Sequence, residues 1–478
     1  LSLVGSEMCI RDRLKGAPNL YQTHPNSPPP QPALPEEERQ KREADKRKAR
    51  KNNGAKRDMH YEMEQEEHDV YPDDPDFDIN KARLVTTAPR ICVRYECVPM
   101  RFIKHVYKIH TYAQDGRLFE GKTPVSAFLN SSYDGSFIAG LMELRYIQSL
   151  PVERIINYFE SHGFTLKKPT AHKLMEKASS LFENLYKCIR QTALSDPYKA
   201  ADETYYKILV PEKNSKGKGV RKGYLWVVVG INTRMIYLLY DDGSRSEKVI
   251  LNELGGCKGI IQSDGYSPYR KLESDAYPHI TRIPCLQHIK RKFIDCGEDE
   301  PDAKRIVELI NTLYQNEHKH KIGVDGWTVE QNLVHRKKYA PDILGEIKDV
   351  LDDIEERGDL LPKSELKEAV TYLRNEWNAV VDIFNYGDTY LDNNIVERMN
   401  RYISLSRKNS LFFGSHKGAE RGAILYTIAL TCRMNKVNLF EYLTDVINRT
   451  AEWQPNTPLE KYRQLPVSYT HLRAHETK

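Results

Sequence analysis

The pattern of apolar and polar positions along the chain changes its period at Pro197. From Ser136 to Leu194, apolar residues recur at helical spacing, which predicts a helical region. After Pro197, short runs of β-branched and aromatic residues alternate with polar positions, which predicts strands. The two patterns together indicate an α/β protein in which a helical region precedes a sheet.

The helical region, residues 136–196, contains two amphipathic helices joined by a short glycine turn. The first should begin near Pro151 and end at His162-Gly163, and Thr170 is the expected cap of the second. Two helices joined in this way form a helix-turn-helix shape. The apolar faces consist of Val152, Ile155, Ile156 and Phe159 in the first helix and Leu174, Ala178, Leu181 and Leu185 in the second.

The start of the second helix is basic, because Lys167, Lys168 and Lys173 lie there. A recognition helix contacts DNA through its first residues, so these lysines are candidate DNA-binding residues. Helix pairs of the same shape also occur in plain helical domains. Both interpretations of residues 136–196 therefore stay open.

After Pro197 the pattern predicts three strands, a helix and a fourth strand. The strands are expected at residues 198–209, 224–229, 235–240 and 259–262, and the helix at residues 245–254. This order is typical of a ribonuclease-H-like mixed sheet. That fold carries one acid on its first strand and another just after its fourth, and Asp202 and Asp264 occupy those two places.

Asp202 and Glu203 form a polar pair inside a strand that otherwise consists largely of apolar and aromatic residues, and an unpaired buried carboxylate is costly. A divalent metal ion would account for it, since Mg²⁺ takes carboxylate oxygens and keeps waters for a phosphate. Glu397 is the best candidate for a third carboxylate, on a helix expected over Ile395–Ile403 that Asp392 or Asn393 can cap. Each acid alone is more often a solvated or capping residue. Their order and their element contexts favour a metal site.

The long interval between Asp264 and Glu397 leaves room for an insertion, and its pattern is helical. The catalytic core should therefore have two parts, residues 197–292 and residues 389–450, the second of which includes a C-terminal helix. An inserted helical subdomain should occupy residues 293–388.

The terminal regions are predicted to contribute little to the fold. Residues 1–80 are Pro-rich and then strongly charged: residues 38–57 hold ten Lys or Arg against three acids, and residues 58–80 hold ten acids. The two blocks can neutralise each other in a disordered linker, or the first can be a basic arm on DNA. Residues 81–135 should form a small β-rich region, and residues 451–478 a disordered tail. We expect residues 1–13 and 467–478 to lie outside the fold.

Cysteine content and hydropathy argue against several protein classes, whereas the charge of the whole chain decides nothing about partners. The net charge of +5 is mild for 478 residues, and the eight cysteines are scattered, which argues against a disulfide scaffold and fits a reducing cytoplasm. The longest apolar runs, such as residues 423–430, are too short to cross a membrane, and we expect no signal peptide. Cys92 and Cys97 lack the second pair that a zinc ribbon needs, so we expect no zinc.

Six sequence blocks resemble the catalytic region of the insertion sequence 66 (IS66) family of bacterial transposases. In chain order they are ADETYYKI, GYLWVVVG, IIQSDGYSPY, CLQHIKRKF, LDNNIVERMNR and RKNSLFFGSHKGAE. The resemblance covers about Arg83–Asn448. It implies a ribonuclease-H-like DDE core with an inserted helical segment, and a transposase that cuts and joins the DNA strands of an insertion sequence.

The resemblance also implies roles for particular residues. Asp202, Asp264 and Glu397 match the acidic triad, which implies two Mg²⁺ or Mn²⁺ ions as cofactors. The His-x-x-Arg-Lys run of the family falls on His288, and its Arg-Lys-Asn block begins at Arg407. The expected contacts to DNA phosphates are Arg291, Lys292, Arg398, Arg401, Arg407 and Lys408; for the last four, structural ion pairing is an equally good interpretation.

His288 should open a helix after the strand Ile280–Pro284. As a neutral imidazole it could donate to the scissile phosphate or orient a water near Asp264. The structural alternative is a histidine that caps the helix through a backbone hydrogen bond. Cys285 and His288 are also spaced as a metal pair, but no second pair follows nearby.

The chain departs from the family at HTYAQDG, which stands where many members carry paired cysteines of a zinc-ribbon-like module. The expected partners are the terminal inverted repeats and the target DNA, further copies of the chain on DNA, and accessory proteins of the same element. The expected location is the bacterial cytoplasm, on the nucleoid. Two alternatives remain, a nuclease of the same fold without strand transfer and a non-catalytic DNA-binding derivative. The complete triad speaks against the second.

Overall fold

The computed structural model describes a large part of the chain, all of it within the unit Cys97–Lys478. The described residues are 100–105, 111–114, 117–120, 127–128, 131–212, 219–358, 360–451, 453 and 457–465. The two charge blocks and the pair Cys92 and Cys97 lie outside them. Of the small β-rich region, the structure describes a two-stranded antiparallel hairpin, β1 (Thr111–Gln114) and β2 (Arg117–Glu120).

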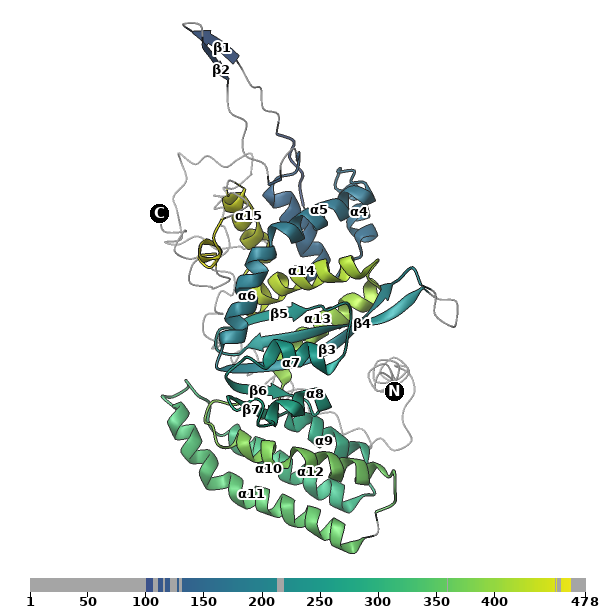
Figure 1. Ribbon diagram of the computed structural model, residues 1–478, viewed down its shortest axis with the longest axis vertical. Coiled ribbons are helices and arrows are strands. Elements are labelled where there is room, and N and C mark those ends of the chain that lie inside the picture. Colours follow the sequence, from purple (N-terminus) through teal and green to yellow (C-terminus); the bar gives the residue numbers. More distant parts are fainter. Residues whose placement is uncertain are drawn as a thin grey trace, which may run out of the picture. The chain divides into compact units, whose positions relative to one another are not determined.

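A five-stranded mixed sheet forms the centre of the described fold (Figure 1). Its order is β5-β4-β3-β6-β7; β3, β4 and β5 pair antiparallel, whereas β6 and β7 continue from β3 in parallel. The strands are β3 (Tyr198–Leu209), β4 (Val220–Gly230), β5 (Met235–Leu239), β6 (Gly259–Ser263) and β7 (Ile280–Pro284), with α7 (Glu247–Leu254) between β5 and β6. The predicted order of three strands, a helix and a fourth strand is confirmed, and so is the α/β class.

The sheet is covered where its strands are apolar. Val227, Val228 and Val229 of β4 are all buried, as expected for a strand that is covered on both faces. The free edge of β5 is covered by α14 (His416–Met434), because the N–H groups of Ile236 and Leu238 donate to threonine hydroxyls of that helix at 3.3 and 2.9 Å. Such a covered edge cannot pair with another chain.

The helical region before the sheet contains more helix than the two predicted elements. It consists of α3 (Gly135–Met142), the π-helical turn η1 (Glu143–Ile147), α4 (Val152–Ser161), α5 (Lys168–Leu181) and α6 (Glu183–Ser195). Gly163 ends α4 with φ of +81°, a conformation that favours glycine. The predicted cap at Thr170 is wrong: α5 begins earlier, since Pro169 suits the first turn of a helix and Lys167 is the N-cap.

The insertion forms its own apolar core beside β7. It contains α10 (Pro301–Glu317), α11 (Val329–Arg357) and α12 (Glu365–Ile383), which pack with α9 (Leu286–Asp295). Their buried residues include Ile306, Leu344 and Leu373. Helix α12 packs along β7 and thereby joins the insertion to the sheet (Figure 1).

The chain returns to the sheet through α13 (Asn394–Asn409) and α14, and ends in α15 (Leu439–Thr450) and α16 (Leu459–Tyr462). We expected residues 451–478 to be disordered, and this does not hold for residues 459–465. Tyr462 and Leu465 are buried against the main core, and Tyr442 Oη donates to the Leu465 carbonyl at 2.9 Å. Among the described helices, none has the length and apolar character to span a membrane.

Candidate active site

Asp202 and Asp264 lie side by side at one edge of the sheet. In the parallel pairing of β3 with β6, Ala200 is opposite Gln262, so two further residues along each strand lead to the two acids. The carboxyl ends of parallel strands meet at the same edge of a sheet, which is why two acids distant in sequence become neighbours here. The charge of Asp264 also contributes to raising the pKa of Asp202, as expected for two neighbouring carboxyl groups.

The carboxyl group of Asp202 is held by neutral donors only. Its Oδ2 accepts a hydrogen bond from Asn400 Nδ2 at 2.5 Å, and its Oδ1 accepts one from the Glu203 N–H at 2.8 Å. Burial, followed by the charges of Glu203 and Asp264, raises the pKa of Asp202 well above its ordinary value. The ionised form therefore lacks a cationic partner in its immediate surroundings.

Glu397 lies on the face of α13 that runs along β3. Two other residues of this face contact the strand directly: Asn393 Nδ2 donates to the Ala201 carbonyl at 3.0 Å, and Asn400 donates to Asp202. Residues three or four apart share a helix face, so Glu397 stands one turn from each asparagine. The helix is longer than predicted, and Asn393 is its N-cap but makes no side-chain cap bond because its amide binds β3 instead.

His288 lies in the first turn of α9, close to Glu397. Its Nδ1 is 3.7 Å from Glu397 Oε1, which is longer than a hydrogen bond. Both atoms are buried and have no hydrogen-bond partner. His288 Nδ1 therefore does not cap the helix through a backbone hydrogen bond. The structure instead places His288 beside Glu397, the predicted third acid.

The residues at this edge fit a hard divalent cation. Asp202 and Asp264 present carboxyl oxygens there, and the neighbouring α13 carries buried oxygens without a hydrogen-bond partner: Asn393 Oδ1, Glu397 Oε1 and Asn400 Oδ1. Buried polar atoms are normally satisfied, so unpaired oxygens beside a cluster of carboxylates call for an explanation. Mg²⁺ and Mn²⁺ prefer carboxylate and carbonyl oxygens, which is the donor set present.

Glu203, the neighbour of Asp202, has a partner of its own. Its Oε1 accepts hydrogen bonds from Arg245 Nη2 at 2.5 Å and Nε at 3.1 Å, and its Oε2 accepts one from Tyr269 Oη at 3.4 Å. Successive residues of a strand point to opposite faces, so Glu203 points away from the face that carries Asp202. Glu203 thus has an ion-pair partner in Arg245, although burial still raises its pKa. Asp202 has no such partner among the described residues.

The turn that carries Asp264 is held by residues that the sequence did not suggest. Arg282 of β7 donates to the Asp264 carbonyl at 2.8 Å and to Ser263 Oγ at 3.1 Å. The same guanidinium donates to Glu376 of α12 at 2.5 Å. Tyr372 of α12 accepts from the N–H of the next residue, Gly265, at 2.8 Å. The inserted subdomain thus contacts the peptide bond after Asp264 directly through Tyr372, and supports it indirectly through the pairing of Glu376 with Arg282.

The predicted DNA-binding residues are found in three places. Lys167, Lys168 and Lys173 are exposed at the start of α5, where Lys168 pairs with Glu153 at 2.8 Å. The other exposed ones are Arg291 and Lys292 on α9 and Arg398, Arg401 and Lys408 on α13.

Arg407 differs from these residues because it is half-buried and bound to the strand. Its Nη1 donates to the Tyr205 carbonyl and to Thr204 Oγ1, and its guanidinium lies 4.0 Å from the centroid of the Tyr205 ring. In this structure Arg407 anchors the second half of α13 to β3. Its structural interpretation is therefore favoured.

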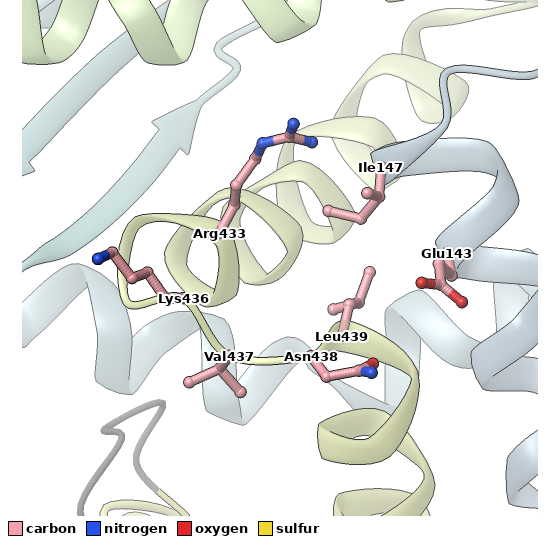
Figure 2. Close-up of a pocket in the computed structure, with 7 residues that line it drawn as sticks. All are labelled: Glu143, Ile147, Arg433, Lys436, Val437, Asn438 and Leu439. Atoms are coloured by element: carbon pink, nitrogen blue, oxygen red, sulfur yellow. The ribbon is translucent and has the colours of Figure 1, made fainter. Parts of the chain in front are cut away.

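A separate pocket lies where η1 faces the turn between α14 and α15 (Figure 2). It is lined by Glu143, Ile147, Arg433, Lys436, Val437, Asn438 and Leu439. Burial raises the pKa of Glu143, with a further contribution from Glu441. The lining includes none of the acids described above, so this pocket is not part of the candidate site.

Several known proteins are similar in sequence to this chain. The chain is similar to three proteins of Sinorhizobium fredii (strain NBRC 101917 / NGR234): Uncharacterized protein y4jD, with 26% identity over 65% of this chain and 61% of the relative; Uncharacterized protein y4qI, with 26% over 77% and 69%; and Uncharacterized protein y4hP, with 24% over 83% and 76%. The chain thus spans less than two thirds of the length of the first. A profile described as Transposase IS66 family matches residues 130–421, more than half of the chain and the segment that carries all three acids. The chain therefore belongs to the IS66 family of transposases.

Proposed function

We propose that this chain cuts DNA at the ends of an insertion sequence and joins them to target DNA, using Asp202, Asp264 and Glu397 in a ribonuclease-H-like core. The observation that carries the proposal is the meeting of Asp202 and Asp264 at the β3–β6 edge, under the face of α13 that presents Glu397. The sheet order β5-β4-β3-β6-β7, with three antiparallel strands followed by two parallel ones, supports this fold. Family membership supports the transposase role.

The three acids would hold two Mg²⁺ or Mn²⁺ ions. Bound there, such ions supply the positive charge that a phosphodiester needs when one oxygen attacks and another leaves. The protein itself would contribute by holding the metal-binding acids in position. Asn400 fixes the orientation of the Asp202 carboxyl group, and Arg282 fixes the backbone of Asp264. Preorganised groups of this kind lower a barrier because they need not reorganise during the reaction.

The proposed reaction has two steps at the same site. In the first, the oxygen of a water attacks the phosphorus at the element end, gives up a proton and becomes an oxygen of the 5′-phosphate. The bond from phosphorus to O3′ breaks, and O3′ takes a proton and becomes a 3′-OH. In the second, that 3′-OH attacks a phosphorus of the target, loses its proton and forms the new strand, while the O3′ of the target leaves. Exposed Arg291, Arg398 and Arg401 are proposed to contact the phosphates of these strands.

The proposed partners are the terminal inverted repeats, the target DNA, further copies of this chain and accessory proteins of the element, in the bacterial cytoplasm. A strand-transfer assay with labelled element ends and Mg²⁺ or Mn²⁺ tests the function. We expect cut ends that become joined to target DNA. Cut ends without joining would indicate a nuclease, and binding without cutting a non-catalytic derivative; either result overturns the proposal.

His288→Ala should lower the cleavage rate by about 10²-fold, the range for a lost acid–base or electrostatic contact. The reason is the position of its ring beside Glu397, with a buried Nδ1 that is free to donate or accept. Single-turnover cleavage of a labelled element end measures the effect. His279→Ala, which changes an exposed histidine outside the site, is the matched control and should cut at the parent rate. If both variants cut as fast as the parent, His288 is structural.

Asp202→Asn should stabilise the cation-free protein. The folded pKa of Asp202 is raised, so the stability that its protonated form provides is complete below about pH 3.9, the unfolded pKa, and is lost as the pH rises through the folded pKa. Near neutral pH the burial of this carboxyl group therefore costs stability. In EDTA at about pH 7 the variant should melt at a higher temperature than the parent. Mn²⁺ should then raise the melting temperature of the parent more than that of the variant, and a variant that melts lower in EDTA would refute this account of the charge.

A further inference from the structure

Three side chains with different donor atoms meet beside the edge of the sheet that carries Asp202 and Asp264. Cys285 lies at the end of β7 as the N-cap of α9, His288 is in the first turn of that helix, and Glu397 comes from α13. The sulfur, an imidazole nitrogen and a carboxylate oxygen all lie within 4.8 Å of one another. The sequence alone shows two of these ligands, and the fold supplies the third.

The polar atoms of this cluster are not satisfied by the protein. His288 Nδ1 and Glu397 Oε1 are both buried, 3.7 Å apart, and without a hydrogen-bond partner. A cation between them would bind both lone pairs. The Cys285 sulfur is fully buried and accepts a hydrogen bond from the Asn393 N–H at 3.2 Å. Burial raises the pKa of this thiol to about 12, so a bound metal ion would displace its proton.

The donor set selects the class of cation. Sulfur, nitrogen and one carboxylate are ligands of Zn²⁺ and related borderline metals, whereas Mg²⁺ prefers oxygen only. Three protein ligands also leave a fourth tetrahedral position open, as in zinc sites that are accessible from solvent. Here His288 and Glu397 are partly exposed, with 30% and 25% of their side chains accessible, so an ion can enter.

We propose that Cys285, His288 and Glu397 bind Zn²⁺ or a similar metal, and that this binding withdraws Glu397 from Asp202 and Asp264. The second part rests on the proposed function, because it assigns Glu397 to the site that cuts DNA. The one carboxylate of Glu397 cannot be fully available to the zinc site and to the site of Asp202 and Asp264 at the same time. Zn²⁺ is therefore an inhibitor of Mg²⁺-dependent cleavage that acts through the buried cysteine.

Cobalt substitution tests the site without any activity. The full chain, freed of metal, is titrated with Co²⁺, and we expect a thiolate-to-cobalt charge-transfer band. The band should disappear in Cys285→Ser and in His288→Ala and remain in Cys257→Ser, a matched change of another buried cysteine. Thermal denaturation confirms that each variant is folded, and Cys285→Ala replaces Cys285→Ser if the serine disturbs the fold. A band that persists without Cys285, or one that never forms, overturns the site.

Inhibition by zinc tests the second part. Each protein is compared with its own rate in Mg²⁺ alone. Cys285→Ser should need at least about tenfold more Zn²⁺ for half inhibition than the parent, since losing even a supporting residue of a metal site costs about 10–100-fold in affinity. Equal inhibition of both would overturn the withdrawal of Glu397. The two proposals fail separately: a cobalt band in a chain that never cuts DNA refutes the function, and cleavage without a band refutes the metal site.

Discussion

Replacing Asp202, Asp264 or Glu397 by alanine should abolish strand cleavage while DNA binding remains. The loss should exceed about 10³-fold, which is more than the loss of a single electrostatic donor in other enzymes, because each acid would hold the cations that make the reaction possible. DNA binding should survive because other, exposed residues are proposed to contact the phosphates, among them Arg291 and Arg401.

The measurement is single-turnover cleavage of a labelled element end, with binding followed by gel shift. Asp353→Ala is the control, since it removes an exposed acid of α11 and should cut at the parent rate. Retained strand transfer in Glu397→Ala alone would mean that the third acid is another residue. Asp388, Asp392 and Glu420 would then be the next candidates.

Glu376→Ala should lower the free energy of unfolding by about 3–5 kcal/mol, the cost of breaking a buried ion pair from one side. Arg282 and Glu376 have side chains that are 0% and 1% exposed, and they are joined at 2.5 Å. The other acidic partner of Arg282 is Glu273, whose side chain is 34% exposed and cannot fully replace a buried carboxylate. Because Arg282 also holds the Asp264 carbonyl, the variant should need more Mg²⁺ for half-maximal cleavage.

Urea unfolding measures the stability of this variant, and a Mg²⁺ titration of the cleavage rate measures the position of Asp264. Glu346→Ala is a matched control in the same subdomain: its pair with Arg305 is also 2.5 Å long but about half exposed, so its loss should cost less than about 1 kcal/mol. Equal losses of stability in the two variants would contradict the role given to burial. An unchanged Mg²⁺ requirement would show that α12 does not position the second acid.

The sequence was sufficient to predict the positions of the acids because local pattern and strand order determine them. Alternating apolar residues define β3 around Asp202, and a short buried run defines β6 just before Asp264. Pairing those strands in parallel brings the acids together. Glu397 could be assigned to a helix from its period, whereas the bond from Asn400 to Asp202 was not predicted.

The supporting contacts could not be predicted, because they join residues far apart in the chain. Nothing local to Arg282 indicates that Glu376, on an inserted helix, will bind it, or that Tyr372 will hold the N–H of Gly265. A β-carbon on that glycine would collide with the tyrosine hydroxyl, a constraint that appears only after packing. The spacing of Cys285 and His288 indicated a possible metal pair, but the third member of the cluster, Glu397, was missed for the same reason.

Two predictions from local sequence pattern were wrong, one at the start of α5 and one in the C-terminal segment. Thr170 is a good cap residue, but the proline before it already starts the helix, and the earlier start places Thr170 inside the first turn. The segment 459–465 has too little pattern to predict a helix by itself. It is ordered by burial of Tyr462 and Leu465 against the main core, an energy that belongs to the tertiary structure.

The most direct test of one site built from Asp202, Asp264 and Glu397 is a crystal structure of the chain with Mn²⁺ and a precut element end, in which anomalous scattering locates the metal. We expect two peaks about 3.5–4 Å apart among the three carboxylates, the separation found in two-metal phosphoryl-transfer sites. An ordered core in which any two of these carboxylates are more than about 10 Å apart would contradict the assignment, since a site of that kind cannot bridge such a distance.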